Sequence, residues 1–203
     1  ETMQIIVNGQ QQAEDKKSQM QALNKQLEEK QVRIQERRGE VQRELAQAEP
    51  ALEAAKNQVQ NIQKKQLDEL RAMAHPPALV KTAMEAVIIM VKGYATETVS
   101  WDSVRKEIRE KDFIANILKY SKDQLTPEIG HRIKDQYVSK RDWNVQSIDR
   151  ASKAAGPLAV WVESQMEYVR ILHSIQPLRE EIVQLEKDQQ DMQLKMQEAS
   201  QMI

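Results

Sequence analysis

The sequence of 203 residues has no cysteine, few glycines and few aromatic residues, the last making up only 4% of the chain. Without cysteine, disulfide bonds and thiolate metal sites are excluded, and the composition is compatible with a reducing compartment. No apolar run approaches the roughly 18 residues of a membrane-spanning helix. No signal-peptide pattern is present and the chain does not begin with methionine, so we expect a piece of a longer protein.

Charged residues make up 30% of the chain, with a formal net charge of −1. Lysine and arginine balance aspartate and glutamate over residues 1–74, at 12 against 12. They are in excess over residues 75–157, at 14 against 11, and in deficit over residues 158–203, at 4 against 8. The central excess is either ordinary surface variation or the sign of a segment that docks on an acidic surface, where complementary fields speed encounter and fix orientation.

Two stretches carry apolar or small residues at spacings that alternate between four and three. This period of 3.5 residues leaves a narrow seam that only another helix can cover. Because a segment of different composition separates the stretches, we expect an all-α chain, in which an antiparallel two-helix coiled-coil stalk is capped by a head of about six short helices. The first seam comprises Val41, Leu45, Ala48, Leu52, Ala55, Val59 and Ile62, and the second comprises Ile171, Ile175, Leu178, Ile182, Leu185, Gln189, Met192, Met196, Ala199 and Ile203.

The first long helix is expected over residues 11–74, with residues 1–10 left open. Ahead of Val41, the heptad pattern places the polar residues Asn24, Gln31 and Arg38 at core positions. Near Gln66 the spacing changes, which is a stutter that locally unwinds a supercoil. Pro50 and Pro177 fall inside the two long helices, where either a tolerated bend or a dedicated hinge is compatible with the sequence.

Two proline-bounded hinges divide the chain. Pro76 and Pro77 end the first arm, because proline lacks an amide proton and pushes its predecessor out of the helical region. Gly156 and Pro157 form the second hinge, after which a helix is expected from Leu158 to the C-terminus. The predicted domains are a first stalk arm (1–74), a helical head (75–157) and a second stalk arm (158–203).

Capping residues predict the helices of the head. Gly93 is a stop for the helix that follows Pro77, and Ser100 is an N-cap for a helix over residues 101–108. A short helix is expected after Asp112. Thr126, followed by a proline, starts the next helix, and Asn144 caps the last one. No alternating strand pattern of useful length is present.

The sequence offers no catalytic chemistry. It has no glycine-rich phosphate loop, and His75, His131 and His173 lack the spacing of metal ligands. We therefore expect no cofactor, no bound metal and no enzymatic activity in this chain. Nucleic-acid binding by the basic head is disfavoured, since its lysines and arginines are interleaved with acids, as in residues 105–112.

Several segments of the head and the stalk resemble a dynein heavy chain, in its stalk and microtubule-binding domain. In the head these are residues 75–81, 101–114 and 150–158; in the stalk they are residues 48–51, 176–179 and 201–203. The resemblance covers roughly residues 15–203 and is closer to cytoplasmic than to axonemal dynein. It implies a cytoplasmic, cytoskeletal protein, part of a minus-end-directed motor whose ATPase ring lies outside this chain and whose parent chain is homodimeric. The implied partner is the microtubule, with no nucleic acid and no membrane.

The resemblance also nominates contact residues. In the family, the first, third and last head helices and the loop after the first contact the microtubule. By position, this implies Lys81 on the first helix, and Arg150 with Lys153 at the last. The family's basic residue on the third helix corresponds to Glu110, so its neighbours would serve instead. The expected microtubule-binding residues are Lys81, Arg105, Arg109, Lys111, Arg150 and Lys153.

The seam suggests how such a stalk would communicate. Sliding one helix past the other by about four residues is roughly 6 Å of travel, which the two hinges would convert into a tilt of the first head helix. Coupling between the two ends of the stalk requires an element with two states, and each end must be able to favour one of them. One rival interpretation is a passive coiled-coil scaffold whose head is a dimerisation module; a helical arm that grips nucleic acid is another.

Overall fold

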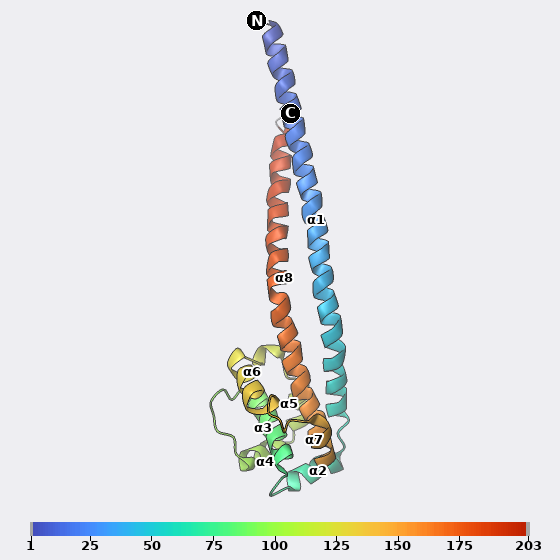
Figure 1. Cartoon of the computed structure of the whole chain (residues 1–203), viewed down its shortest axis with the longest axis vertical. Coiled ribbons are helices and arrows are strands. Elements are labelled where there is room, and N and C mark those ends of the chain that lie inside the picture. The colour runs from blue at the N-terminus through green and yellow to red at the C-terminus, as the bar shows by residue number, and fades with distance from the viewer. Residues whose placement is uncertain (1, 202–203) are drawn as a thin grey trace. The chain divides into compact units, whose positions relative to one another are not determined.

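The computed structural model describes residues 2–201, which form helices and connecting segments without a strand (Figure 1). This confirms the all-α prediction. The α-helices are α1 (Thr2–Gln60), α2 (Lys64–Ala72), α3 (Ala78–Lys92), α4 (Trp101–Arg109), α5 (Phe113–Leu118), α6 (Pro127–Ile133), α7 (Val145–Ala151) and α8 (Ala155–Gln201). A 3₁₀ turn (Lys122–Gln124) and a π-helical segment (Lys134–Val138) complete them. The chain divides into two units: one combines the segment up to Leu45 with that from His173, and the other is Ala46–Leu172.

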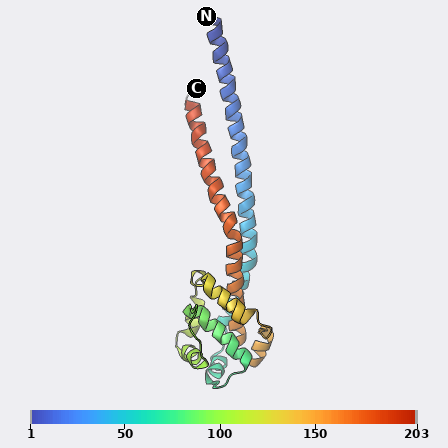
Figure 2. The ribbon, with the colours of Figure 1, turned by 60° about the vertical axis from the view of Figure 1, so that its left-hand side comes forward.

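The first unit, which we call the distal coil, pairs the N-terminal part of α1 with the C-terminal part of α8 in opposite directions (Figure 2). Ile34, Ile175 and Leu185 are buried along the seam. Ion pairs bridge the two helices: Lys30 Nζ lies 3.0 Å from Asp188 Oδ2, and Arg37 Nε lies 2.9 Å from Glu181 Oε2. The antiparallel pairing that the period predicted is therefore confirmed here.

The predicted core frame of the distal coil is wrong at alternate positions. Asn24, Gln31 and Arg38 are exposed rather than at the seam. The partly buried positions are one residue earlier, at Leu23, Lys30 and Arg37. The pattern is ambiguous because the spacing between successive seam residues changes at Val41, and the frame cannot be continued backwards through such a stutter. The seam of this arm comprises Met20, Leu23, Leu27, Lys30, Ile34, Arg37, Val41 and Leu45.

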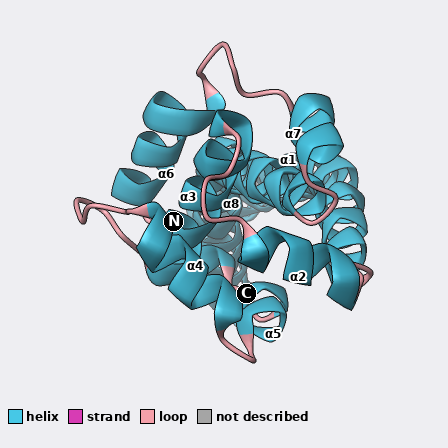
Figure 3. Ribbon diagram, turned by 90° about the horizontal axis from the view of Figure 1, so that it is seen from below, coloured by secondary structure: helices cyan, strands magenta, loops and turns pink. Residues whose placement is uncertain are grey.

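The second unit, which we call the head unit, packs helices α2–α7 with the adjoining parts of α1 and α8. Seen from below, α3 lies among α4, α6 and α7 (Figure 3), and it packs against all three. Eight of its residues are buried, which explains the long apolar run in its sequence. The core extends to Val59 of α1 and to Trp161 of α8, whose ring meets Tyr120 edge-on at 5.3 Å.

The predicted caps of the head helices are confirmed. Ser100 Oγ accepts a hydrogen bond from Ser103 N, Thr126 Oγ1 from Ile129 N and Asn144 Oδ1 from Ser147 N. At the end of α3, Gly93 adopts the left-handed conformation with φ of 70°, which a residue without a Cβ adopts at least cost. Local hydrogen bonds thus place these helix ends before any tertiary contact is considered.

Two predicted helix boundaries are wrong. The first arm does not run unbroken to residue 74: α1 ends at Gln60, and α2 begins after a cap in which Gln66 Oε1 accepts from Gln63 N at 3.0 Å. Leu67 and Leu70 bury in the head core, so tertiary packing redirects the chain here. The second long helix begins at Ala155, not at Leu158, because Ser152 Oγ caps the Ala155 amide at 3.1 Å. Both helices continue through Pro50 and Pro177.

Candidate functional site

The cations expected to make contacts all lie in the head unit, on α3, on α4 and α7, which pack against it, and in the segments that directly follow α4 and α7. Lys81 is exposed on α3 itself, and Arg150 is exposed in the last turn of α7, which packs against α3. Arg109 ends α4, and Lys111 lies in the connection to α5. Arg150 and Lys153 line one open groove together with Gln58 and Pro157.

Three of these cations are unpaired. Among the residues that the structure describes, Arg109, Lys111 and Arg150 form no ion pair within 4.0 Å. All three are exposed. Unpaired, solvated guanidinium and ammonium groups are well suited to meet an acidic surface, because no intramolecular contact must break first.

Two of the other nominated cations, Lys81 and Lys153, are already engaged in ion pairs. Lys153 Nζ lies 2.5 Å from Asp149 Oδ2, and Lys81 Nζ lies 3.9 Å from Glu85 Oε1, both pairs being spaced i, i+4. The Lys153–Asp149 pair is exposed on both sides and contributes under about 1 kcal/mol, so an external carboxylate can replace the internal one. Arg105 differs, since it is half-buried and its Nε is buried without a hydrogen bond.

Glu85 is held by a residue that the sequence gave no reason to link to it. Tyr137, in the π-helical segment after α6, donates its hydroxyl to Glu85 Oε2 at 3.2 Å. Burial raises the pKa of the Glu85 carboxyl, against the lowering effects of the Tyr137 hydrogen bond, Lys81 and Arg132. Burial and the nearby carboxylate also raise the pKa of Tyr137 to about 12. The carboxyl that neutralises Lys81 is therefore itself partly desolvated.

The predicted hinges have different structures. Pro76 lies in the link between α2 and α3, and Pro77 is the N-cap residue of α3, with extended dihedrals. Gly156 and Pro157 lie inside the first turn of α8, where a missing amide proton leaves no hydrogen bond unmade. Gly156 is buried, and a Cβ there would come within 2.8 Å of Asp149 Cα on α7.

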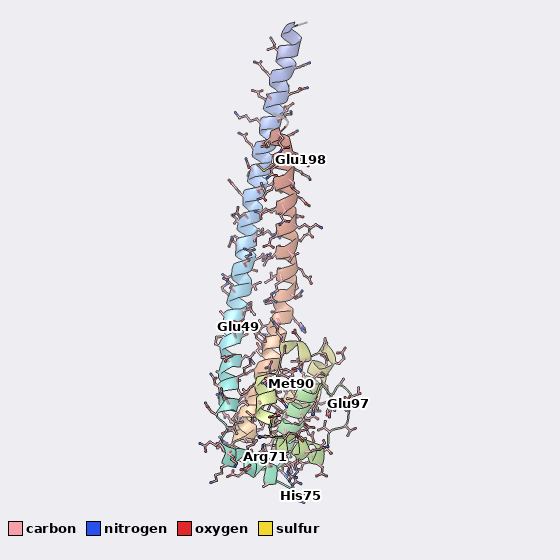
Figure 4. All side chains as sticks on the ribbon, turned by 180° about the vertical axis from the view of Figure 1, so that it is seen from behind. Glu49, Arg71, His75, Met90, Glu97 and Glu198 are labelled. Atoms are coloured by element: carbon pink, nitrogen blue, oxygen red, sulfur yellow. The ribbon has the colours of Figure 1, made fainter. Side chains whose placement is uncertain are left out.

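Long-range side-chain contacts complete the head and were not predicted from the sequence. Arg132 donates to the carbonyls of Tyr94 and Glu97 at 2.9 and 2.8 Å, which secures the loop between α3 and α4. Arg71 of α2 donates to the carbonyl of Ile108. Figure 4 labels Arg71, which lies in α2, and Glu97, which lies in the loop between α3 and α4. Nothing in the spacing of an isolated arginine indicates which carbonyl it will reach.

No described cluster of histidines and carboxylates could hold a metal ion. Likewise, none of the helices between residues 2 and 201 is both long and apolar enough to span a bilayer.

Replacing Glu85 by glutamine is expected to stabilise the head at neutral pH. When folding raises the pKa of a carboxyl, the folded protein is most stable below the ordinary pKa of that group. This stability is lost as the pH rises through the pKa of the folded state. The Glu85→Gln variant should therefore unfold at higher urea concentration than the wild type at pH 7, with the difference closing near pH 4. Denaturation followed by circular dichroism across pH measures this.

Tyr137→Phe provides the matched comparison. Because the tyrosine hydroxyl favours the charged carboxylate, removing it should enlarge the gain from Glu85→Gln at neutral pH. A pH-independent difference between Glu85→Gln and the wild type would contradict the assignment.

An antiparallel helical coil and a compact helical head with exposed cations place the chain among all-α proteins that combine a coiled coil with a helical domain. Comparison with known families gives the particular one: the model of the family described as the microtubule-binding stalk of dynein motor matches residues 3–203. The chain belongs to this family. The resemblance noted in the sequence is thereby confirmed.

Curated relatives agree with the family. The chain is 40% identical over 188 residues to dynein heavy chain-like protein 1 of Plasmodium falciparum, covering 93% of this chain and 4% of that protein. It is 39% identical over 194 residues to the cytoplasmic dynein heavy chain of Dictyostelium discoideum, covering 95% and 4%. The chain thus spans a small fraction of these relatives.

A solved structure described as the microtubule-binding domain of dynein-c aligns with a TM-score of 0.57 and 28% identity. The alignment covers 68% of this chain and 94% of that one. The family and its relatives favour the stalk interpretation over a passive scaffold.

Proposed function

We propose that this chain docks on the microtubule through a cationic surface formed by Lys81, Arg109, Lys111, Arg150 and Lys153, with Arg105 in a supporting place. The observation that carries the proposal is the set of unpaired cations at the ends of α4 and α7, on helices that pack around α3. Tubulin presents an acidic surface, so complementary charge orients the head and speeds its encounter.

The two paired cations of this surface can change partners when the head binds. Lys81 and Lys153 exchange Glu85 and Asp149 for tubulin carboxylates on binding, and the exchange at Lys153 has little net cost because its internal pair is exposed on both sides. The unpaired cations supply most of the net attraction. This division predicts strong dependence on ionic strength, since exposed charges are screened over roughly 10 Å at 0.1 M salt.

The coil is proposed to relay a signal through its register. In the distal coil, Lys30 faces Asp188 and Arg37 faces Glu181 at partly buried positions. A slip of about four residues, roughly 6 Å, would bring neutral side chains opposite both cations. The charges therefore favour the present register by a small margin, and a signal at either end of the coil can overcome it. The proline-containing link before α3 and the first turn of α8 would absorb the movement.

The remaining assignments follow from the family. We infer that ATP hydrolysis belongs to a ring outside these residues, that the chain itself is not an enzyme, and that the parent motor is minus-end-directed and homodimeric. The same inference places it in the cytoplasm on the cytoskeleton, without nucleic-acid or membrane binding. The stalk arms are proposed as residues 1–74 and 158–203 and the head as residues 75–157, with α2 as the part of the first arm that packs in the head core.

Co-sedimentation with microtubules across a salt series tests the docking proposal. The chain should pellet with microtubules at low salt, and its affinity should fall steeply as salt rises. Repeating the series after proteolytic removal of tubulin's acidic tails separates binding to the tubulin body from binding to the tails. Affinity that is absent at low salt, or insensitive to salt, would contradict an electrostatic dock; self-association without microtubule binding would favour the scaffold.

A further inference from the structure

Helix α2 is a separate element between the first coil arm and the head. A three-residue link, residues 61–63, parts it from α1, and its own cap starts it anew. Leu67 and Leu70 are buried in the head core, so α2 is anchored on the head side of the link. Displacement of α1 therefore reaches the head through this helix as well as through the direct packing of Val59 in the head core.

Two side-chain hydrogen bonds join α2 to α4. Arg71 Nε, in the last turn of α2, donates to the carbonyl of Ile108 at 2.8 Å. Trp101 Nε1, at the first position of α4, donates to the carbonyl of Met73 at 2.8 Å. Asp68 pairs with the Arg71 guanidinium at 3.1 Å and orients it.

In each of the two hydrogen bonds, one helix donates to a carbonyl at the C-terminal end of the other. The last carbonyls of any α-helix have no partner within the helix and need one from elsewhere. Met73 is the C-cap of α2, and Ile108 lies in the last turn of α4. Each helix therefore supplies the donor that the C-terminal end of the other requires, and moving one helix alone would leave carbonyls of both without these partners.

We propose that Arg71 and Trp101 are positioning residues that make α2 and α4 move as one body, so that the segment carrying Arg109 and Lys111 follows the first coil arm. This inference rests on the proposed function, in which those two cations contact the microtubule. Arg109 comes directly after the carbonyl that Arg71 holds. The coil would thus reach the contact surface through α2 and α4, in addition to any tilt of α3.

A pair of tryptophan substitutions tests the proposal with matched chemistry. Trp101→Phe removes the donor to Met73 while keeping an aromatic ring. Trp143→Phe removes an equivalent donor, to Glu163 Oε1 of α8 at 2.7 Å, from the link before α7, and this hydrogen bond involves neither α2 nor α4. With one hydrogen bond lost in each, Trp101→Phe should weaken microtubule affinity about fivefold, whereas Trp143→Phe should leave it within about twofold.

Arg71→Lys gives the second arm, because it preserves the charge but loses the planar donor. In this variant and in Trp101→Phe, hydrogen exchange of the Glu110 and Phe113 amides, which bond to carbonyls at the end of α4, should accelerate at least threefold in the free chain. In Trp143→Phe it should not change.

Unchanged exchange at these amides in Arg71→Lys and Trp101→Phe would overturn the proposal, as would unchanged affinity of both variants. Failure of the wild type to bind microtubules would instead overturn the proposed function. In that case the exchange rates alone still decide whether α2 and α4 move together.

Discussion

Reversing two charges, Lys81→Glu with Arg150→Glu, is expected to lower microtubule affinity about 100-fold at low ionic strength, or about tenfold for each site. Lys81 and Arg150 lie on α3 and α7, two helices that pack together. Each reversal removes an attraction and adds a repulsion against the acidic surface of tubulin. The loss should shrink as salt rises, because the added repulsion is screened along with the attraction. Co-sedimentation at several salt concentrations measures both effects.

A variant with the same change in net charge separates the site from the overall field. Arg43 and Arg179 are exposed in the distal coil, and Arg43→Glu with Arg179→Glu should leave affinity within about threefold. Circular dichroism must confirm that Lys81→Glu, which places a second carboxylate at i, i+4 from Glu85, retains the fold. Equal losses in the two double variants would show that general charge, rather than this surface, drives binding.

The head could be predicted in detail because its helix ends are marked locally. Ser100, Thr126 and Asn144 accept hydrogen bonds from amides three residues ahead, and Gly93 supplies a left-handed stop. Such signals act within one turn of the chain, so the sequence contains all that they need. The antiparallel seam beyond Val41 was equally readable, because its period is regular.

Predictions failed where distant contacts decide the structure. The break after Gln60 depends on burial of Leu67 and Leu70 in the head, and no local signal there is stronger than an ordinary glutamine cap. The distal seam was placed one residue off at alternate positions, since a stutter near Val41 shifts the frame. Consequently the true seam cations, Lys30 and Arg37, were not recognised from the sequence.

In the candidate site, too, features set by local sequence could be predicted, whereas contacts between distant residues could not. The structure places Lys81, Arg109, Lys111, Arg150 and Lys153 at the surface, as expected for charged side chains. Their role as contacts came from the resemblance and stays a prediction. The partners of the supporting residues were out of reach: Tyr137 lies 52 residues from Glu85, and Arg71 lies 37 from Ile108. Such pairs exist only once the helices have packed.

Gly156→Ala is expected to destabilise the head by about 1–3 kcal/mol, the usual cost of forcing atoms into a filled core. The added Cβ would lie 2.8 Å from Asp149 Cα, a backbone atom that cannot rotate away as a flexible side chain would. The first turn of α8 and helix α7 must therefore separate. Because α7 carries Arg150, microtubule affinity should fall together with stability. Urea denaturation and co-sedimentation measure the two effects.

Gly130→Ala is the matched control for this substitution. Gly130 lies inside α6, and a Cβ there meets no atom within 4 Å. Alanine should therefore stabilise this helix by about 0.5–1 kcal/mol, because it restricts the unfolded chain without a clash. The opposite signs at two helical glycines distinguish close packing from glycine's general effect on helices. If Gly156→Ala were as stable as the wild type, α7 and the start of α8 would not be in contact as closely as the structure indicates.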